Sequence, residues 1–367
     1  MRSFIAMGMA LVAGCGDNLS ADDDLTAPDN WATDTATPEM AERLTPKICS
    51  AQTFESVTYD AKDSILRAVP ASNGASVFMV PRSGGVLRGF QIDGRGLVIG
   101  NPQGQKIRSN VAFTDVSASR VDGRLIVGVV AGIQTSVMAI RDDLQDFREL
   151  ALVDGTLMGD TAGMHVHNTR VTTTGGASGM QMTTFDANWA AMGTEVVARS
   201  VPTSMTSAAY GNDAMISWST PTECHVQRIG AGIESMRPFP CTNGRLAVDY
   251  AQRGGWLVYE RDGGIMIAGI VVDGQNQIAS AKPLVRFGTS PRIAYDGAHY
   301  WISYIDLRGD VVMGLLDSSG SALDGVALEG TQPLAGAYDI AMSGSNPWVF
   351  ALDGNGLGAT KLCISRL

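Results

Sequence analysis

His165 and His167, two of only four histidines in the chain, are separated by a single residue. In a β-strand alternate side chains point to the same face, so this spacing predicts two imidazoles side by side. Imidazole binds first-row metals, but a protein metal site needs three or four ligands, and the sequence identifies no third one. We therefore expect either a ligand or metal site at this pair or two hydrogen-bonded structural histidines, and we assign no cofactor.

Carboxylates are the other side chains that could carry chemistry. Asp249, Asp296 and Asp339 recur beside similar apolar segments. Glycosidases use two or three carboxylates that converge on one site. Aspartates repeated at equivalent positions also suit turns, where they fix the backbone geometry, and we interpret these three as turn residues. We assign no catalytic residue, and the sequence favours a non-enzymatic protein, with a hydrolase or lyase acting on polysaccharide or lactone as the alternative.

Sequence motifs exclude several familiar activities. The chain has no G-x-S-x-G elbow, no H-E-x-x-H, no P-loop and no dinucleotide-binding glycine motif. Its net charge of −10 argues against nucleic acid, which requires clustered lysine and arginine. The remaining partners are a protein, a carbohydrate or a membrane surface.

Four cysteines of the chain body predict two disulfides, as expected in an exported protein. Cys224 and Cys241 flank a glycine-containing turn at 230–232, which places them opposite each other across one hairpin. Cys49 opens the body, and Cys363 lies in its last predicted strand. A bridge between Cys49 and Cys363 would therefore join the two ends of the body.

Short strands and tight turns must position all of these residues. Three apolar, β-branched or aromatic runs at 293–295, 300–305 and 311–316 are separated by polar turns, which predicts an antiparallel meander. Asp-Gly and Asn-Gly pairs, which supply the positive φ of hairpin turns, recur along the chain. The chain is therefore predicted to be all-β.

The same meander recurs about every 45 residues, a period typical of β-propeller blades with four short strands each. We predict a single seven-bladed propeller, with a six-bladed ring or an array of β-sandwiches as alternatives. The second strands of the seven units begin near Val77, Leu125, Val171, Met215, Trp256, Trp301 and Trp348.

The last unit ends after three strands, because no residues remain for a fourth. An unpaired outer edge would expose backbone donors and acceptors. We expect the N-terminal segment 48–57 to supply the missing strand by pairing with 360–365. The predicted Cys49–Cys363 bridge would then lock the ring.

Residues 1–15 combine one basic residue, Arg2, with a short apolar run and the sequence Val-Ala-Gly-Cys ending at Cys15. This segment resembles the signal peptide and lipobox of bacterial lipoproteins. The resemblance implies that Cys15 carries the lipid, that the preceding peptide is removed, and that the protein is tethered to a membrane. The alternative is an ordinary secretory signal with an incidental cysteine.

Residues 16–46 hold eight acidic residues and one basic residue, which predicts a solvated, flexible linker. The predicted organisation is therefore a signal peptide at 1–15, an acidic linker at 16–46 and a propeller at 47–367.

The repeat unit AYDGAHYWISY, followed by a glycine-containing turn and a strand ending in aspartate, resembles the degenerate repeats of bacterial lipoprotein propellers of unassigned function. The resemblance covers roughly residues 60–367. It implies a protein anchored to the cell envelope, with the outer membrane as the expected location, that uses a propeller face to bind or scaffold a protein or carbohydrate partner. An outer-membrane assembly subunit is a further alternative.

Overall fold

The computed structural model describes residues 44–54, 64–71, 74–81, 84–230, 233–241, 246–251, 254–271, 277–279, 281–317 and 319–366. The predicted signal peptide, Cys15 and nearly all of the predicted linker lie outside the described residues. The first strand begins at Leu44, slightly before the predicted boundary at Lys47. Among the described residues, no helix is long and apolar enough to span a membrane.

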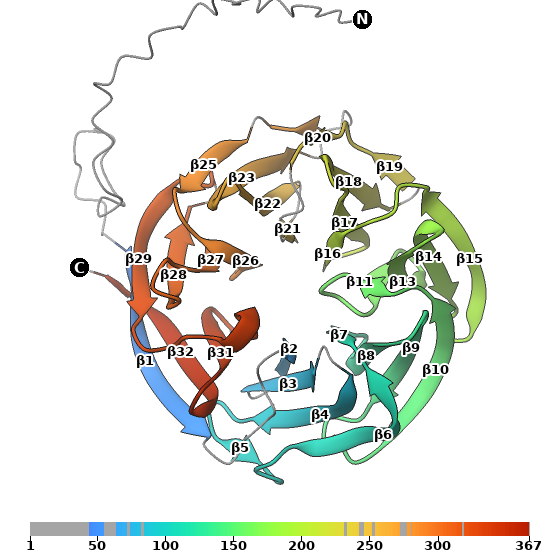
Figure 1. Cartoon of the computed structure of the whole chain (residues 1–367), viewed down its shortest axis with the longest axis horizontal. Coiled ribbons are helices and arrows are strands. Elements are labelled where there is room, and N and C mark those ends of the chain that lie inside the picture. The colour runs from blue at the N-terminus through green and yellow to red at the C-terminus, as the bar shows by residue number, and fades with distance from the viewer. Residues whose placement is uncertain are drawn as a thin grey trace, which may run out of the picture. The chain divides into compact units, whose positions relative to one another are not determined.

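Seven antiparallel sheets form a ring, which confirms the predicted seven-bladed β-propeller and excludes the six-bladed and β-sandwich alternatives (Figure 1). Blades 1 to 3 consist of the following strands: β2 (Ser64–Ala71), β3 (Gly74–Pro81), β4 (Gly85–Ile92), β5 (Val98–Ile99) and β6 (Gln105–Phe113); β7 (Asp115–Val121), β8 (Arg124–Ala131), β9 (Gln134–Ile140) and β10 (Phe147–Asp154); and β11 (Leu157–Met158), β12 (Met164–Val166), β13 (Thr169–Gly176), β14 (Gly179–Phe185) and β15 (Ala191–Ala198).

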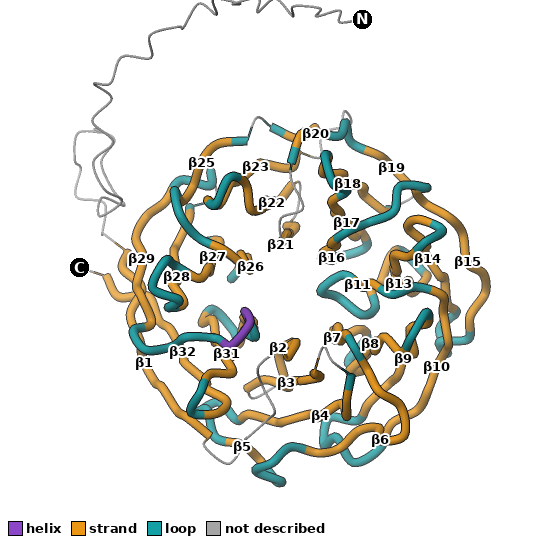
Figure 2. Tube along the Cα trace, in the orientation of Figure 1, coloured by secondary structure: helices purple, strands orange, loops and turns teal. Residues whose placement is uncertain are grey.

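Blades 4 to 7 continue the ring in chain order. Their strands are β16 (Ser204–Tyr210), β17 (Asp213–Ser219), β18 (Glu223–Ile229), β19 (Ile233–Ser235) and β20 (Phe239–Pro240); β21 (Leu246–Ala251), β22 (Gly254–Arg261), β23 (Gly264–Val271), β24 (Gln277–Ile278) and β25 (Lys282–Val285); β26 (Thr289–Tyr295), β27 (Tyr300–Ile305), β28 (Val311–Leu316) and β29 (Ala322–Leu328); and β30 (Tyr338–Ser343), β31 (Asn346–Asp353), β32 (Gly356–Arg366) and β1 (Leu44–Phe54). Figure 2 shows how completely strands make up the ring, with a short 3-10 helix, η2 (Leu334–Gly336), toward its centre.

The middle strands of each blade are buried on both faces because a neighbouring blade covers each face. In β3, for example, Val77, Phe78, Met79 and Val80 are all fully buried. This explains why most second strands are nearly continuous apolar runs rather than alternating ones. The exception is β13, where Thr172, Thr173 and Thr174 fill the buried positions. Trp218, Trp301 and Trp348 lie at second-strand positions and are buried in this core.

The N-terminal strand closes the ring as predicted. β1 pairs antiparallel with β32 from Leu44 opposite Arg366 to Phe54 opposite Leu357. A register shift between Ile48 and Ser50 leaves Cys49 as the extra residue of a bulge, and its disulfide to Cys363 joins Cα atoms 5.9 Å apart.

The second disulfide joins Cys224, in β18, to Cys241, which directly follows β20. Its Cα atoms are 5.5 Å apart, and both cysteines are buried. Both bridges therefore have the pairing that the hairpin and ring-closure arguments predicted.

Strand direction alternates outward through each blade, which gives the ring two different faces. We call the upper face the one that carries the turns between first and second strands, such as Asp122–Gly123 between β7 and β8. The lower face carries the turns between second and third strands, such as Asp262–Gly263 between β22 and β23. Because β1 runs antiparallel to β32, its first residue, Leu44, lies at the upper face.

Candidate functional site

A pocket of about 490 Å³ opens in the central channel. Its walls come from the first strands of the blades, which have the channel on their inner side. On β2 and β7 the lining residues are 68–70 and 118–121, toward the strand ends that lead to the upper face. The polar residues that line the pocket are Ser119, Arg120, Asp122, Asp160, Thr161, His165, Ser207, Arg292 and Asp339.

Arg292 and Asp339 form a buried ion pair in the pocket wall between blades 6 and 7. Arg292 Nε lies 3.2 Å from Asp339 Oδ1, and both side chains are about nine-tenths buried, with 10% and 12% exposed. The backbone N–H of Ala68, in blade 1, donates to Asp339 Oδ2 at 2.9 Å. Asp339 therefore links three blades where the ring closes.

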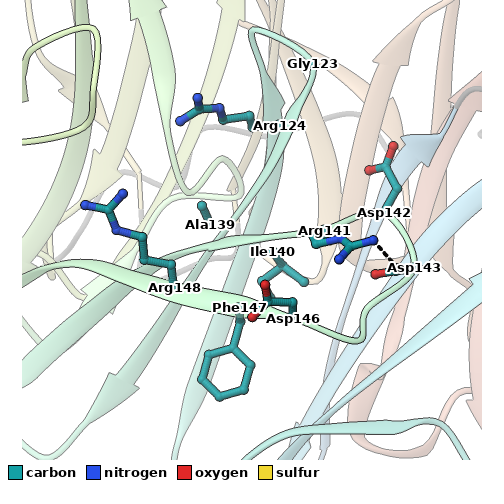
Figure 3. A pocket seen from close by; sticks show the side chains of 10 residues that line it. All are labelled: Gly123, Arg124, Ala139, Ile140, Arg141, Asp142, Asp143, Asp146, Phe147 and Arg148. Carbon is teal, nitrogen blue, oxygen red and sulfur yellow. Dashed lines mark ion pairs between the residues drawn. The ribbon is translucent and has the colours of Figure 1, made fainter.

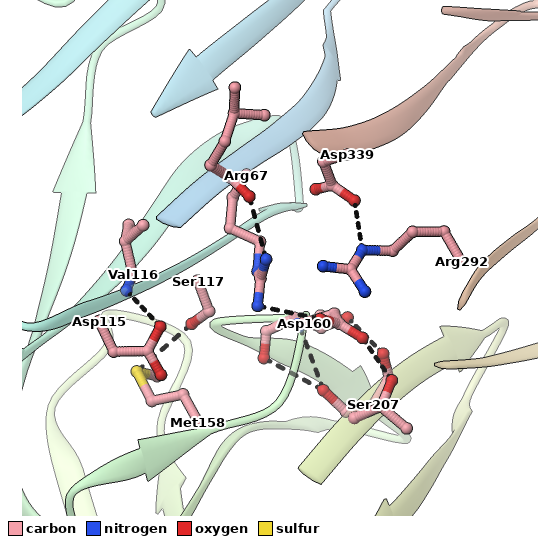
Figure 4. A network of polar contacts seen from close by, with 12 residues as sticks. Arg67, Asp115, Val116, Ser117, Met158, Asp160, Ser207, Arg292 and Asp339 are labelled. Atoms are coloured by element: carbon pink, nitrogen blue, oxygen red, sulfur yellow. Dashed lines mark hydrogen bonds and ion pairs between the residues drawn. The ribbon is translucent and has the colours of Figure 1, made fainter. Parts of the chain in front are cut away.

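Asp160 carries a second negative charge into the channel from the loop between β11 and β12 in blade 3. Its Oδ1 lies 3.3 Å from Arg67 Nη2 of blade 1, and its Oδ2 accepts a hydrogen bond from the Thr206 hydroxyl of blade 4. Arg67 also donates from Nη1 to its neighbour Leu66 O at 3.0 Å. The loop therefore connects blades that are not adjacent in the ring (Figure 4).

The loop at 159–163 is held against blade 4. The Thr161 N–H donates to Ser207 Oγ at 3.1 Å, and the Thr161 hydroxyl donates to Ser207 O at 2.9 Å. Glycine is required at Gly159, because a Cβ there would lie 2.2 Å from Ser207 Oγ. A Cβ at Gly163 would lie 2.8 Å from the ring of Trp189. Gly159 therefore lets the loop lie close to blade 4, and Gly163 lets it pack on Trp189 of its own blade, which together hold Asp160 in the pocket.

Burial and the neighbouring charges shift the pKa values of Arg292 and Asp339 in opposite directions. Burial raises the pKa of the Asp339 carboxyl, while Arg292 and Arg67 oppose that rise. Burial alone would lower the pKa of Arg292, but Asp160 and Asp339 outweigh it, and the pKa lies above its ordinary value. Arg292 is therefore held charged. The pocket lining brings Arg292, Asp160 and Asp339 close together, and Arg67 pairs with Asp160.

The interpretation of Asp339 as a turn residue is wrong. Asp339 lies within β30, paired with Phe350, and its side chain lines the channel pocket. Asp249 likewise lies within a strand, β21, paired with Trp256. Asp296 is a turn residue as predicted, since its Oδ1 accepts the N–H groups of Ala298 and His299, each at 2.7 Å.

His165 and His167 are not placed by simple strand alternation. His165 lies in β12 and lines the pocket, with Nδ1 3.9 Å from Asp122 Oδ1. His167 follows the end of this short strand with φ of 49°, is exposed, and donates its N–H to Asn212 O at 3.1 Å. A left-handed residue interrupts the alternation, so the argument for a shared face fails. Within the described ranges, no group of three or more His, Cys, Asp or Glu could hold a metal ion.

Arg67, Asp160 and Arg292 were not identified from the sequence. Arg67 and Arg292 each interrupt a short first strand, SILRAVPA and TSPRIAY, in which most other residues are uncharged. Because first strands line the channel of a propeller, a charge inside one was a usable signal. Asp160 had no such signal, since it lies in a loop between two very short strands.

Comparison with known proteins supports the fold and leaves the ligand open. No protein-family model and no curated protein sequence matches the chain. Among solved structures, the BP39L lectin from Burkholderia pseudomallei is similar, with a TM-score of 0.63 and 15% identity over 83% of this chain and 97% of the lectin. Hydrazine synthase from Kuenenia stuttgartiensis has a TM-score of 0.58 and 13% identity over 85% of this chain and 97% of that one.

The SapL1 lectin, solved with α-methyl fucoside, has a TM-score of 0.50 and 13% identity over 76% of this chain and 98% of the lectin. The chain is thus a β-propeller of the same general architecture as these proteins. Two lectins and a hydrazine synthase share this architecture, so the fold by itself does not define a function.

Proposed function

We propose that this protein is a binding lipoprotein of the bacterial cell envelope whose ligand is a carbohydrate held in the channel pocket. The observation that carries the proposal is the group of charged side chains at that pocket: Asp160, Arg292 and Asp339 line it, and Arg67 pairs with Asp160. Guanidinium groups only donate hydrogen bonds, and carboxylates only accept them. A sugar hydroxyl does both, so neighbouring hydroxyls can bridge such groups without bringing a net charge into the pocket.

The composition of the pocket also suggests how tightly a sugar would bind. Its described lining includes no tryptophan, tyrosine or phenylalanine, so binding would rest on hydrogen bonds rather than on ring stacking. Sugar hydroxyls would take the place of water molecules on polar atoms that are already hydrogen-bonded in the free protein. The net gain in hydrogen bonding would therefore be small. We therefore expect modest affinity and strong dependence on hydroxyl stereochemistry. Two solved propellers with a similar fold are lectins, which agrees with this proposal.

Anchoring completes the proposed role. Lipid on Cys15 and the acidic linker at 16–46 would hold the propeller at the outer membrane, with the linker as a spacer. The two disulfides indicate an exported protein. Leu44 lies at the upper face, so the linker would join the propeller on the side toward which the pocket lies.

The proposal is tested by screening the purified full-length protein on an array of bacterial and plant glycans, followed by calorimetry with the best ligand. Asp160→Asn keeps the shape of the side chain but removes its charge, and we expect it to weaken binding on the order of tenfold. Asp262→Asn is the matched control, because Asp262 is 80% exposed in a turn of the lower face. Wild-type protein that binds no glycan would overturn the proposal.

A hydrolase acting on the same ligand is the second candidate. The favouring observation is that Asp160 and Asp339 both line the pocket and that burial raises the pKa of Asp339. Hydrolysis of a glycosidic bond needs one protonated and one ionised carboxyl group. Incubating the protein with its best glycan and analysing the products by mass spectrometry separates the two functions, since a binding protein returns the ligand unchanged.

A further inference from the structure

A second pocket, of about 550 Å³, lies at the upper end of blade 2 (Figure 3). It is built on the ends of β8, β9 and β10, on the β7–β8 turn and on the β9–β10 turn. Three arginines, Arg124, Arg141 and Arg148, line it. Three aspartates, Asp142, Asp143 and Asp146, line it as well. Asp142 pairs with Arg120 and Asp143 pairs with Arg141.

The three arginines are not equivalent. Arg141 Nη2 lies 2.8 Å from Asp143 Oδ2 and is already paired. Arg124 and Arg148 are exposed, and neither forms an ion pair with any residue that the structure describes. Ala139 pairs directly with Arg148 across the β9–β10 ladder. In the view of Figure 3 its small side chain lies beside Arg148, and the guanidinium groups of Arg124 and Arg148 extend to the same side. The pair therefore presents two available positive groups beside a hollow.

Arg120 connects this pocket to the channel. It lines the channel pocket, and its Nε donates to Pro70 O at 3.1 Å. Its Nη1 lies 2.8 Å from Asp142 Oδ1 and donates to Gly123 O at 3.2 Å. Asp142 and Gly123 line the blade 2 pocket. The two pockets therefore meet at the β7–β8 turn, with Arg120 between them.

We infer that the two pockets form one extended site for an acidic polysaccharide. The channel pocket binds sugar hydroxyls, and Arg124 and Arg148 bind a carboxylate or sulfate on a following residue of the same chain. This inference rests on the proposed carbohydrate function and specifies the substrate class. A single sugar would fill only one pocket, whereas an oligosaccharide crossing the β7–β8 turn would contact both. Charge-assisted hydrogen bonds to the free guanidinium groups would then favour an acidic chain over a neutral one.

The test is an array of uronic-acid oligosaccharides in matched pairs, with each carboxylate either free or methyl-esterified. We expect wild-type full-length protein to bind the free acids on the order of tenfold more tightly than the esters, with the difference shrinking as salt is raised. Arg124→Gln combined with Arg148→Gln should abolish this preference, so that the free acids bind no more tightly than the esters. Arg308→Gln, which removes an exposed arginine from a lower-face turn, is the control for net charge.

The outcomes separate this inference from the function on which it rests. Binding without preference for the free acids, or a preference that survives the double substitution, overturns the extended acidic site while carbohydrate binding stands. A preference lost equally in Arg308→Gln would be a net-charge effect and would also overturn it. Absence of binding to every saccharide by wild-type protein overturns the carbohydrate function itself.

Discussion

Cys49 and Cys363 are 314 residues apart in the sequence, and a disulfide joins them within the last blade. Cys49 lies in the bulge of β1, and Cys363 lies in β32, the strand that β1 covers. The bond therefore spans the blade that is assembled from both ends of the body.

We predict that Cys49→Ala together with Cys363→Ala lowers the free energy of unfolding by about 2–5 kcal/mol, because the bridge restricts the unfolded chain over a very long loop. Urea denaturation of the oxidised wild type and the variant measures the difference. A change within about 0.5 kcal/mol would show that strand pairing alone closes the ring.

Cys224 and Cys241 provide the internal comparison. Their separation is 17 residues, and they already lie on one hairpin-like connection, so the chain-entropy contribution of this bridge is smaller. We expect Cys224→Ala with Cys241→Ala to lower stability less than loss of the ring-closing bridge does. The opposite order in urea would contradict the closure argument.

The Arg292–Asp339 pair gives a second prediction. Arg292→Met leaves a buried carboxyl group without its closest cation, and we expect a loss of about 3–5 kcal/mol. Combining Arg292→Met with Asp339→Leu removes both charges and should recover part of that loss. A double-mutant cycle measured by urea denaturation checks this, and strictly additive losses would mean that the two side chains do not depend on each other.

Gly320 and Trp256 show how neighbouring blades fit together. Gly320 has φ of +73°, and a Cβ on it would lie 2.5 Å from the Trp256 ring. We expect Gly320→Ala to lower stability by about 1–3 kcal/mol, through backbone strain and the clash. In a Trp256→Leu background the same substitution should be milder, because only the strain remains. Thermal unfolding of the four proteins checks this, and an equal penalty in both backgrounds would rule out the clash.

His225 predicts a response to acid. It stacks on Trp218 with ring centroids 5.0 Å apart, and burial lowers the pKa of His225, with Glu223 opposing the effect. The unfolded chain therefore takes up a proton more readily than the folded one, so stability is lost as the pH falls below the ordinary histidine value of 6.5. We expect His225→Phe, which keeps an aromatic stack, to lose less stability between pH 7.5 and 5.5.

Urea midpoints at these two pH values measure the acid response. His167→Asn, on an exposed turn, is the matched control and should retain the wild-type difference between the two conditions. An unchanged acid response in His225→Phe would assign the effect to other groups.

Anchoring is tested at Cys15. We expect Cys15→Ser to move the protein from the membrane fraction to the soluble extract, because the serine hydroxyl cannot form the thioether that the lipobox resemblance implies. Fractionation with a salt wash, followed by immunoblotting, measures the distribution. A variant that stays with the membranes through the wash would reject the lipid anchor.

The sequence predicted those features of the fold that depend on local pattern. Second strands such as that at Trp301 are apolar runs that recur at a nearly constant spacing with tight turns between them, so the number of blades could be predicted. The closing strand followed from the short last repeat and from Cys49. The strand and turn signals lie within the elements that they predict, whereas the closing strand was inferred from the strand missing at the other end of the chain.

The channel site could be predicted only in part. His165 was identified as a candidate from the sequence. The strand that holds it ends at Val166, directly before His167, and no local sequence pattern indicates this strand end. Asp160 depends on Arg67 and Thr206, which are far from it in the chain and come from other blades. Contacts between inner strands of different blades join residues that are far apart in the chain, so the periodicity of a single sequence does not predict them.

The pairing of β1 with β32 also sets an order of events during biosynthesis. β1 is made before every other strand of the propeller, and its partner, Gly356–Arg366, is made last. The earliest strand must therefore remain unpaired while the other blades form, and Cys49 has no native partner until Cys363 has reached the oxidising compartment. A chain that stops before Gly356 can complete six blades, but the seventh would retain an open edge that none of its own residues can cover.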